Sequence, residues 1–204
     1  MATSSRFAIA PVPQKRSKLD RVLAACFIRN VMNRKITRMI LVGALALAAN
    51  PILFAETFPG TDEGAKQLAN AFLKPGADCA ALSKQLRPSA ADYAAVFDAD
   101  FGTKVAAAWD PAWEAGKMVM APKPGQTEVK ISSATTDELK AGTGNAAELA
   151  GGWKDAAAKM KPGLKVYRCH FLEPGKTAGM SFDGLIYVNG NWRVFPKPWR
   201  ALEN

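Results

Sequence analysis

Histidine and cysteine are scarce in this chain. Its 204 residues include one histidine and three cysteines, and no two cysteines form a Cys-x-x-Cys pair. A dithiol redox centre of that kind and a metal site built from several histidines are therefore excluded. A hydrolase triad would have to use His170 as its base, and no nucleophile elbow around a serine accompanies it.

Phosphate-binding loops are missing as well. Gly142-Thr143-Gly144 and Gly151-Gly152 lack both the Lys-Ser/Thr pair and the strand–loop–helix setting of such a loop. We interpret these glycines as parts of flexible loops. Together these absences lead us to predict neither a metal ion nor a cofactor.

Basic charge is abundant but unevenly distributed. The chain has a formal net charge of +9, and residues 1–55 contain nine Lys/Arg and a single acidic residue. The remaining 149 residues keep 18 Lys/Arg and 17 Asp/Glu, so their net charge is +1. A near-neutral domain lacks the basic excess of a nucleic-acid-binding protein, and nucleic acid is not among the predicted partners.

An apolar run at residues 39–55 follows Arg34, Lys35 and Arg38. A basic flank, a short apolar core and small residues at its end are the three parts of a secretory signal. We predict a signal peptide at 32–55 and a periplasmic or secreted domain at 56–204. Residues 1–31 are then a disordered extension or an over-extended start. The alternative is an uncleaved membrane anchor, although 17 residues fall short of the roughly 20 that a span needs.

The first half of the domain has the periodicity of helices. Apolar residues recur with helical spacing after Thr61, after Asp78 and after Ser89, each of which can cap a helix. A further helical stretch is expected to be interrupted at Asp110-Pro111, where proline suits the first turn of another short helix. Residues 136–162 are predicted to be an irregular excursion that ends in a short helical patch.

The second half alternates as strands do. Strands are predicted at 118–120, 127–135, 164–172, 180–188 and 191–195. Asn189-Gly190 predicts a two-residue type I′ hairpin between the last two, because both turn positions need a positive φ. That register puts Leu185, Tyr187, Trp192 and Val194 on a core face, and Ile186, Val188, Asn191 and Arg193 on a more exposed face.

Helices followed by antiparallel strands indicate an α+β fold, with N-terminal helices packed on a curved antiparallel sheet of about four strands. The leading helices, the late meander and the segment Asp183–Val194 (DGLIYVNGNWRV) resemble the nuclear-transport-factor-2-like superfamily, in an uncharacterised exported bacterial branch. The resemblance implies a sheet curled into a cone around the helices. A cystatin-like sheet over a helix and an unrelated α+β domain are the alternatives.

Asp183 and His170 are the candidate catalytic residues. The resemblance implies that a pocket aspartate, often with His or Tyr, can act as acid or base. Strand parity places Asp183 with Leu185 and Tyr187, but a bulge at Gly184 would turn it to the other face. The alternative for both residues is a purely structural role.

Aromatic residues supply the candidate ligand-binding wall. The chain has five tryptophans, and a pocket lined by some of them would hold a flat apolar ligand. The candidates are Trp109, Trp113, Tyr187 and Trp192. Cys79 and Cys169 are either joined by a disulfide or two buried thiols.

These features predict an exported α+β domain that binds a small apolar molecule or an envelope protein without catalysis. The first alternative is a cone-fold enzyme that uses Asp183 and His170 for acid–base chemistry. The second is a dimerisation or assembly module that forms a homodimer through a sheet face. Contact with a membrane is expected only through the signal segment, if that segment is not cleaved.

Overall fold

A computed structural model describes residues 57–203 of the chain. The predicted extension at 1–31 and the predicted signal peptide at 32–55 lie outside the described residues. Across residues 57–203, every helix is too short or too polar to span a bilayer.

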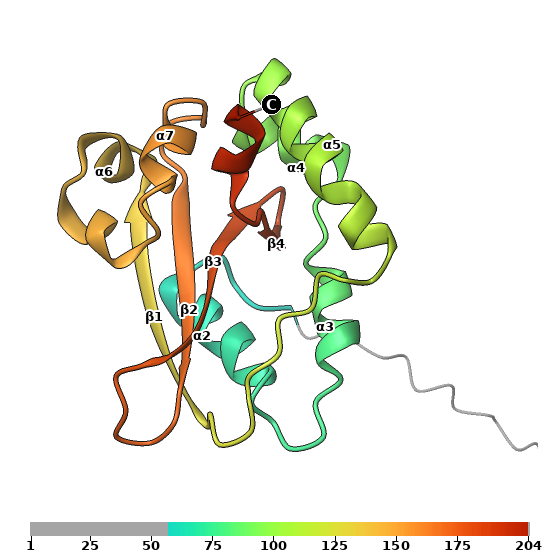
Figure 1. Cartoon of the computed structure of the whole chain (residues 1–204), viewed down its shortest axis with the longest axis vertical. Helices are drawn as coiled ribbons and strands as arrows, with labels where there is room; N and C mark the ends of the chain where they lie inside the picture. Colours follow the sequence, from blue (N-terminus) through green and yellow to red (C-terminus); the bar gives the residue numbers. More distant parts are fainter. Residues whose placement is uncertain (1–56, 204) are drawn as a thin grey trace, which may run out of the picture. The chain divides into compact units, whose positions relative to one another are not determined.

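Helices form the first half of the domain and return between the first two strands (Figure 1). They are α2 (Asp62–Ala71), α3 (Cys79–Gln85), α4 (Ala90–Val96), α5 (Ala99–Glu114), α6 (Thr136–Ala141), α7 (Trp153–Ala157) and the 3₁₀ helices η1 (Gly144–Glu148) and η2 (Pro198–Leu202). The predicted caps are confirmed, because the side chains of Thr61, Asp78 and Ser89 accept backbone N–H groups at the starts of α2, α3 and α4.

Four antiparallel strands make one sheet in the order β1-β2-β3-β4. They are β1 (Glu128–Thr135), β2 (Lys165–Leu172), β3 (Gly179–Val188) and β4 (Asn191–Val194). The α+β fold class is therefore confirmed. The predicted hairpin is confirmed too: Leu185 pairs with Val194 and Val188 with Asn191, around Asn189 at φ 50° and Gly190 at φ 76°. The strand predicted at 118–120 is not formed.

Each face of this sheet carries a buried cluster. One face carries the α5–α7 cluster, whose main members are Val96, Phe97, Trp153, Val166, Ile186, Val188 and Phe195. The other carries the α2–α3 cluster, whose main members are Leu68, Phe72, Tyr167, Phe171, Leu185 and Trp192. The expectation that Ile186 and Val188 lie on a more exposed face is wrong. The reason lies in residues 136–162, which bring buried Trp153 onto that face. The helical patch predicted at the end of this segment is confirmed as α7, but the part before it is not irregular, since it forms α6 and η1.

The helix expected to break at Pro111 does not break. α5 runs from Ala99 to Glu114 with Pro111 inside it. Proline removes one backbone hydrogen bond and strains the preceding turn. Trp113, only 9% exposed, packs into the α2–α3 cluster, and the apolar surface buried there offsets the lost bond.

A β-bulge at Gly184 interrupts the pairing of β2 with β3. Tyr167 faces Leu185, whereas the next residue, Arg168, faces Asp183, so Gly184 has no partner of its own. Gly184 has φ +99°, a conformation that glycine adopts readily. The expectation that Asp183 shares a face with Leu185 is therefore wrong, and the alternative of a bulge is confirmed.

Cys79 and Cys169 are free thiols, so the disulfide alternative is not formed in this structure. Cys79 begins α3, is half-buried, and its thiol lies 3.8 Å from the Phe72 carbonyl oxygen. Cys169 lies in the middle of β2, fully buried beneath the α2–α3 cluster. Burial raises the pKa of Cys169 to about 12.

Native alkylation with iodoacetamide at pH 8 is expected to modify Cys79 and to leave Cys169 unmodified. The thiolate is the reactive form, and Cys169 is both shielded and protonated at that pH. Peptide mass spectrometry would locate the adducts, and urea should expose both thiols. A linked Cys79–Cys169 peptide in the unreduced digest would contradict this result.

Candidate ligand-binding cavity at the open edge of β3

A cavity of about 430 Å³ lies between the sheet and the helices α3, α5 and η2. Its volume is within the range of small-molecule sites. Most of its wall is apolar, and the residues that line it are Ser83, Leu86, Trp109, Trp113, Met118, Val119, Met120, Ala150, Ser181, Phe182, Asp183, Val194, Pro196, Lys197, Trp199 and Arg200.

The cavity is located at the unpaired edge of β3. β4 has four residues and pairs only with Leu185–Val188, beside one end of β3 (Figure 1). Phe195 still donates its N–H to the Gly184 carbonyl oxygen at 2.9 Å, and the chain then leaves the sheet at Pro196. Consecutive side chains of a strand point to opposite faces, yet the three consecutive residues 181–183 all line the cavity. A cavity that touches all three must lie beside the strand and not on one of its faces.

Three indoles contribute to the wall. Trp109 and Trp113 are four residues apart on α5, and they share one side of it because the helix continues through Pro111. Trp199 comes from η2 and packs edge-to-face against buried Trp153, with ring centroids 5.6 Å apart. The candidates Trp109 and Trp113 thus lie together at the cavity. Trp199 was missed, since no periodic pattern in 195–204 indicates which way it points.

The candidates Tyr187 and Trp192 do not line this cavity. Their rings pack against each other at a centroid distance of 5.2 Å, on the α2–α3 side of the hairpin. The Trp192 Nε1–H donates to the carbonyl oxygens of Phe58 and Pro59, at 3.1 and 3.2 Å. A second hollow of about 370 Å³ borders them, and half of its wall is polar. We therefore assign Tyr187 and Trp192 to holding the start of the domain.

Asp183 lies at the cavity with its carboxylate largely buried, its side chain 16% exposed. One oxygen accepts the Ala150 N–H at 3.3 Å, and the other lies 3.6 Å from the Arg168 Nε. Arg168 is itself held by hydrogen bonds to the Ser181 hydroxyl and to the Glu148 carbonyl oxygen. Burial raises the pKa of Asp183, and the charge of Arg168 opposes that rise.

His170 shares the sheet face of Asp183 but does not line the cavity. In the register it lies between Lys130 on β1 and Ser181 on β3. Burial first, and then the charges of Arg168 and Lys130, lower the pKa of His170. The bulge thus brings both catalytic candidates to one face, while only Asp183 contacts the cavity. Within residues 57–203, no three His, Cys, Asp or Glu side chains group closely enough to hold a metal ion.

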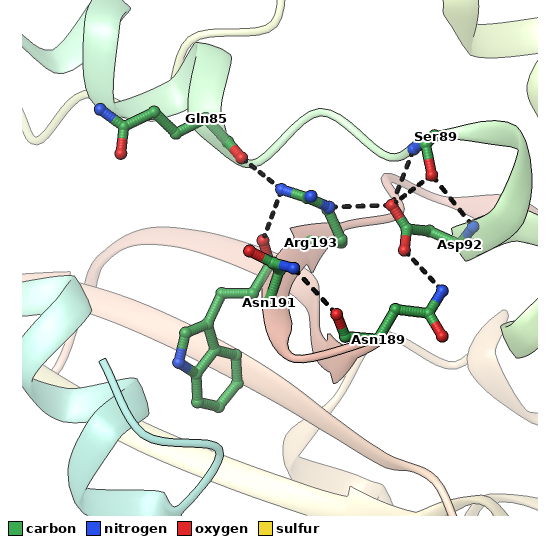
Figure 2. A network of polar contacts seen from close by, with 7 residues as sticks. Gln85, Ser89, Asp92, Asn189, Asn191 and Arg193 are labelled. Atoms are coloured by element: carbon green, nitrogen blue, oxygen red, sulfur yellow. Dashed lines mark hydrogen bonds and ion pairs between the residues drawn. The ribbon is translucent and has the colours of Figure 1, made fainter. Parts of the chain in front are cut away.

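A buried polar network lies on the face of the hairpin opposite to Tyr187 and Trp192 (Figure 2). Asp92, 2% exposed, accepts hydrogen bonds from the Ser89 N–H and hydroxyl and from the Asn189 amide, each 2.8 Å long. The Arg193 Nε donates to the same carboxylate at 2.9 Å, and another guanidinium nitrogen donates to the Gln85 carbonyl oxygen at 2.6 Å. Burial raises the pKa of Asp92, but these hydrogen bonds outweigh it and hold the pKa below its ordinary value.

This network fixes one wall of the cavity. Arg193 is on β4, Asp92 is in the first turn of α4, and Gln85 ends α3. Directly beside it, the Val194 N–H donates to the Leu86 carbonyl oxygen at 2.9 Å, and both of these residues line the cavity. The role of the network is therefore to hold α3 and the end of β4 together.

We compared the chain with protein-family models, curated proteins and solved structures. No family model, curated protein or solved structure matches this chain. The likeness to the nuclear-transport-factor-2-like superfamily stays a prediction, and the functional argument depends on the geometry of the cavity.

Proposed function

We propose that this chain is a non-catalytic binding protein whose cavity beside β3 takes a small, flat, apolar molecule. The observation that carries the proposal is the convergence of Trp109, Trp113 and Trp199 on one cavity of about 430 Å³. Indoles offer large rigid faces to a flat ligand, and a mostly apolar wall favours a molecule with few polar groups. We keep the predicted export of the domain as part of this proposal.

Binding of moderate strength is expected. For a ligand of about 17 non-hydrogen atoms, roughly 0.5 kcal/mol per atom gives a dissociation constant on the order of micromolar. N-phenyl-1-naphthylamine has this size, carries no charge at pH 7, and fluoresces when it leaves water. It is therefore the probe for the apolar character of the cavity.

The variant Val119→Asp is expected to weaken binding of N-phenyl-1-naphthylamine about tenfold in a fluorescence titration. Val119 lines the cavity and is 39% exposed, so the substitution adds a charge to the wall without opening the core. A charged group in an apolar wall must lose water when the ligand binds, and that loss opposes binding.

Leu202→Asp is the matched control. Leu202 is 40% exposed and lies on η2, yet it does not line this cavity. Its variant should bind the probe as the wild type does. If wild type binds no probe, or if both variants weaken binding equally, the cavity is not the binding site and the proposal fails.

A further inference from the structure

Three ionisable side chains line the cavity: Asp183, Lys197 and Arg200. Asp183 and Lys197 are not equally available to a ligand. The Asp183 carboxylate is mostly buried, accepts the Ala150 N–H, and forms an ion pair with Arg168. Its negative charge is thus compensated by groups of the protein, and it contributes little net charge to the cavity.

Lys197 is placed differently. It is exposed, and no acidic side chain within residues 57–203 lies within ion-pair distance of its ammonium group. Its backbone has the left-handed φ of +41°, which costs a lysine about 1–2 kcal/mol relative to the right-handed form. Pro196 and the buried Pro198 flank it, and their fixed φ angles restrict the backbone on both sides of the lysine.

Arg200 brings a second cationic side chain to the same wall. It follows Lys197 by three residues, along η2, and Trp199 lies between the two. The cavity therefore combines an apolar interior, one carboxylate that is already compensated, and the ammonium group of Lys197. Lys197 gives a positive balance to the charge that a ligand meets.

We infer that the ligand is an anionic amphiphile, with a flat apolar body among the indoles and a carboxylate at Lys197. This inference rests on the proposed function, since it specifies the chemical class that the same cavity takes. Opposite charges at the rim stabilise the complex, and they also guide the ligand to the entrance. Aromatic walls attract cations as well, so the competing outcome is preference for an ammonium group.

Three probes of one shape separate these outcomes. They are 1-naphthylacetate, 2-(1-naphthyl)ethanol and 2-(1-naphthyl)ethylammonium, which share the ring and differ in the charge of the side arm. Isothermal titration calorimetry at pH 7 and 20 mM salt should show the anion binding about tenfold more tightly than the alcohol, with the cation weakest. Raising the salt to 300 mM should shrink the preference for the anion, because rim charges are screened.

The variant Lys197→Gln should bind the anion and the alcohol with similar affinity while the affinity for the alcohol stays unchanged. Lys176→Gln is the control, because Lys176 is an exposed lysine on a distant turn that does not line the cavity. If the alcohol binds but the cation binds as well as the anion or better, the inference is overturned and the proposed function stands. If no probe binds, the proposed function fails.

Discussion

Arg193→Ala is expected to lower the free energy of unfolding by about 3–5 kcal/mol. Arg193 supplies the positive charge for Asp92, whose side chain is only 3% exposed, and it also donates to the Gln85 carbonyl oxygen. Without the guanidinium, a buried carboxylate loses its countercharge, and water cannot replace it. Urea denaturation followed by circular dichroism at pH 7 would measure the loss.

Arg87→Ala is the matched control. Arg87 also forms ion pairs, with Glu114 at 3.2 Å and Asp110 at 3.7 Å, but its side chain is 37% exposed. Exposed pairs contribute about 0–1 kcal/mol, so this variant should unfold close to the wild-type urea concentration. Equal losses in the two variants would show that burial of the Asp92 pair has no special role.

The same pair predicts the acid response. The folded-state pKa of Asp92 lies below its ordinary value of 3.8, so its contribution to stability is complete above that value. It is lost as the pH falls through the folded-state pKa. Asp92→Asn should therefore be less stable than wild type at pH 7, and the gap between the two should narrow below about pH 4.

Gly184→Ala is expected to cost about 2–4 kcal/mol of stability. Gly184 has φ +99°, which is strained for alanine, and an added Cβ would clash with the Phe195 carbonyl oxygen and the Trp153 ring. The clash would also disturb the bulge that carries Asp183 to the Arg168 face. A thermal melt would report the loss.

Gly175→Ala separates the two causes. Gly175 also has a positive φ, +71°, but nothing lies within 4 Å of the position that its Cβ would take. Only the backbone strain remains, and it costs about 1–2 kcal/mol. If Gly184→Ala is no more destabilising than Gly175→Ala, then the close approach of Phe195 and Trp153 does not constrain the bulge.

Local signals predicted the helix caps and the hairpin register. Thr61, Asp78 and Ser89 each cap a helix with their own side chain, and Asn189-Gly190 fixes its register through two positive φ angles. These features depend on neighbours within four residues, so the sequence alone specifies them. The order of helices and strands was predictable too, because helical spacing and strand alternation are properties of each segment by itself.

The predictions that were wrong concern segments whose structure depends on tertiary packing. Pro111 was expected to end a helix, but Trp113 finds a buried site that keeps α5 continuous. Ile186 and Val188 were assigned to a more exposed face, because the hairpin register puts them opposite to Leu185, Tyr187, Trp192 and Val194. That face is covered because Trp153 and its neighbours fold onto it.

Only part of the candidate site was predicted, because its other residues are placed by tertiary packing. Trp109 and Trp113 lie at the cavity, while Tyr187 and Trp192 hold residues 58–60 instead. Asp183 was singled out, and whether it faces Leu185 or Arg168 depends on a one-residue bulge. Lys197 and Trp199 were not found, because their positions follow from where the chain leaves β4.

The central claim is that a small apolar ligand binds beside the open edge of β3. The most direct measurement is a ¹H–¹⁵N spectrum of the five indole Nε1–H groups during titration with 1-naphthylacetate. The resonances of Trp109, Trp113 and Trp199 are expected to shift together. The resonance of Trp192 should stay in place, because its Nε1–H donates hydrogen bonds to the carbonyl oxygens of Phe58 and Pro59. A shift confined to Trp192, or no shift at saturating ligand, would contradict the account.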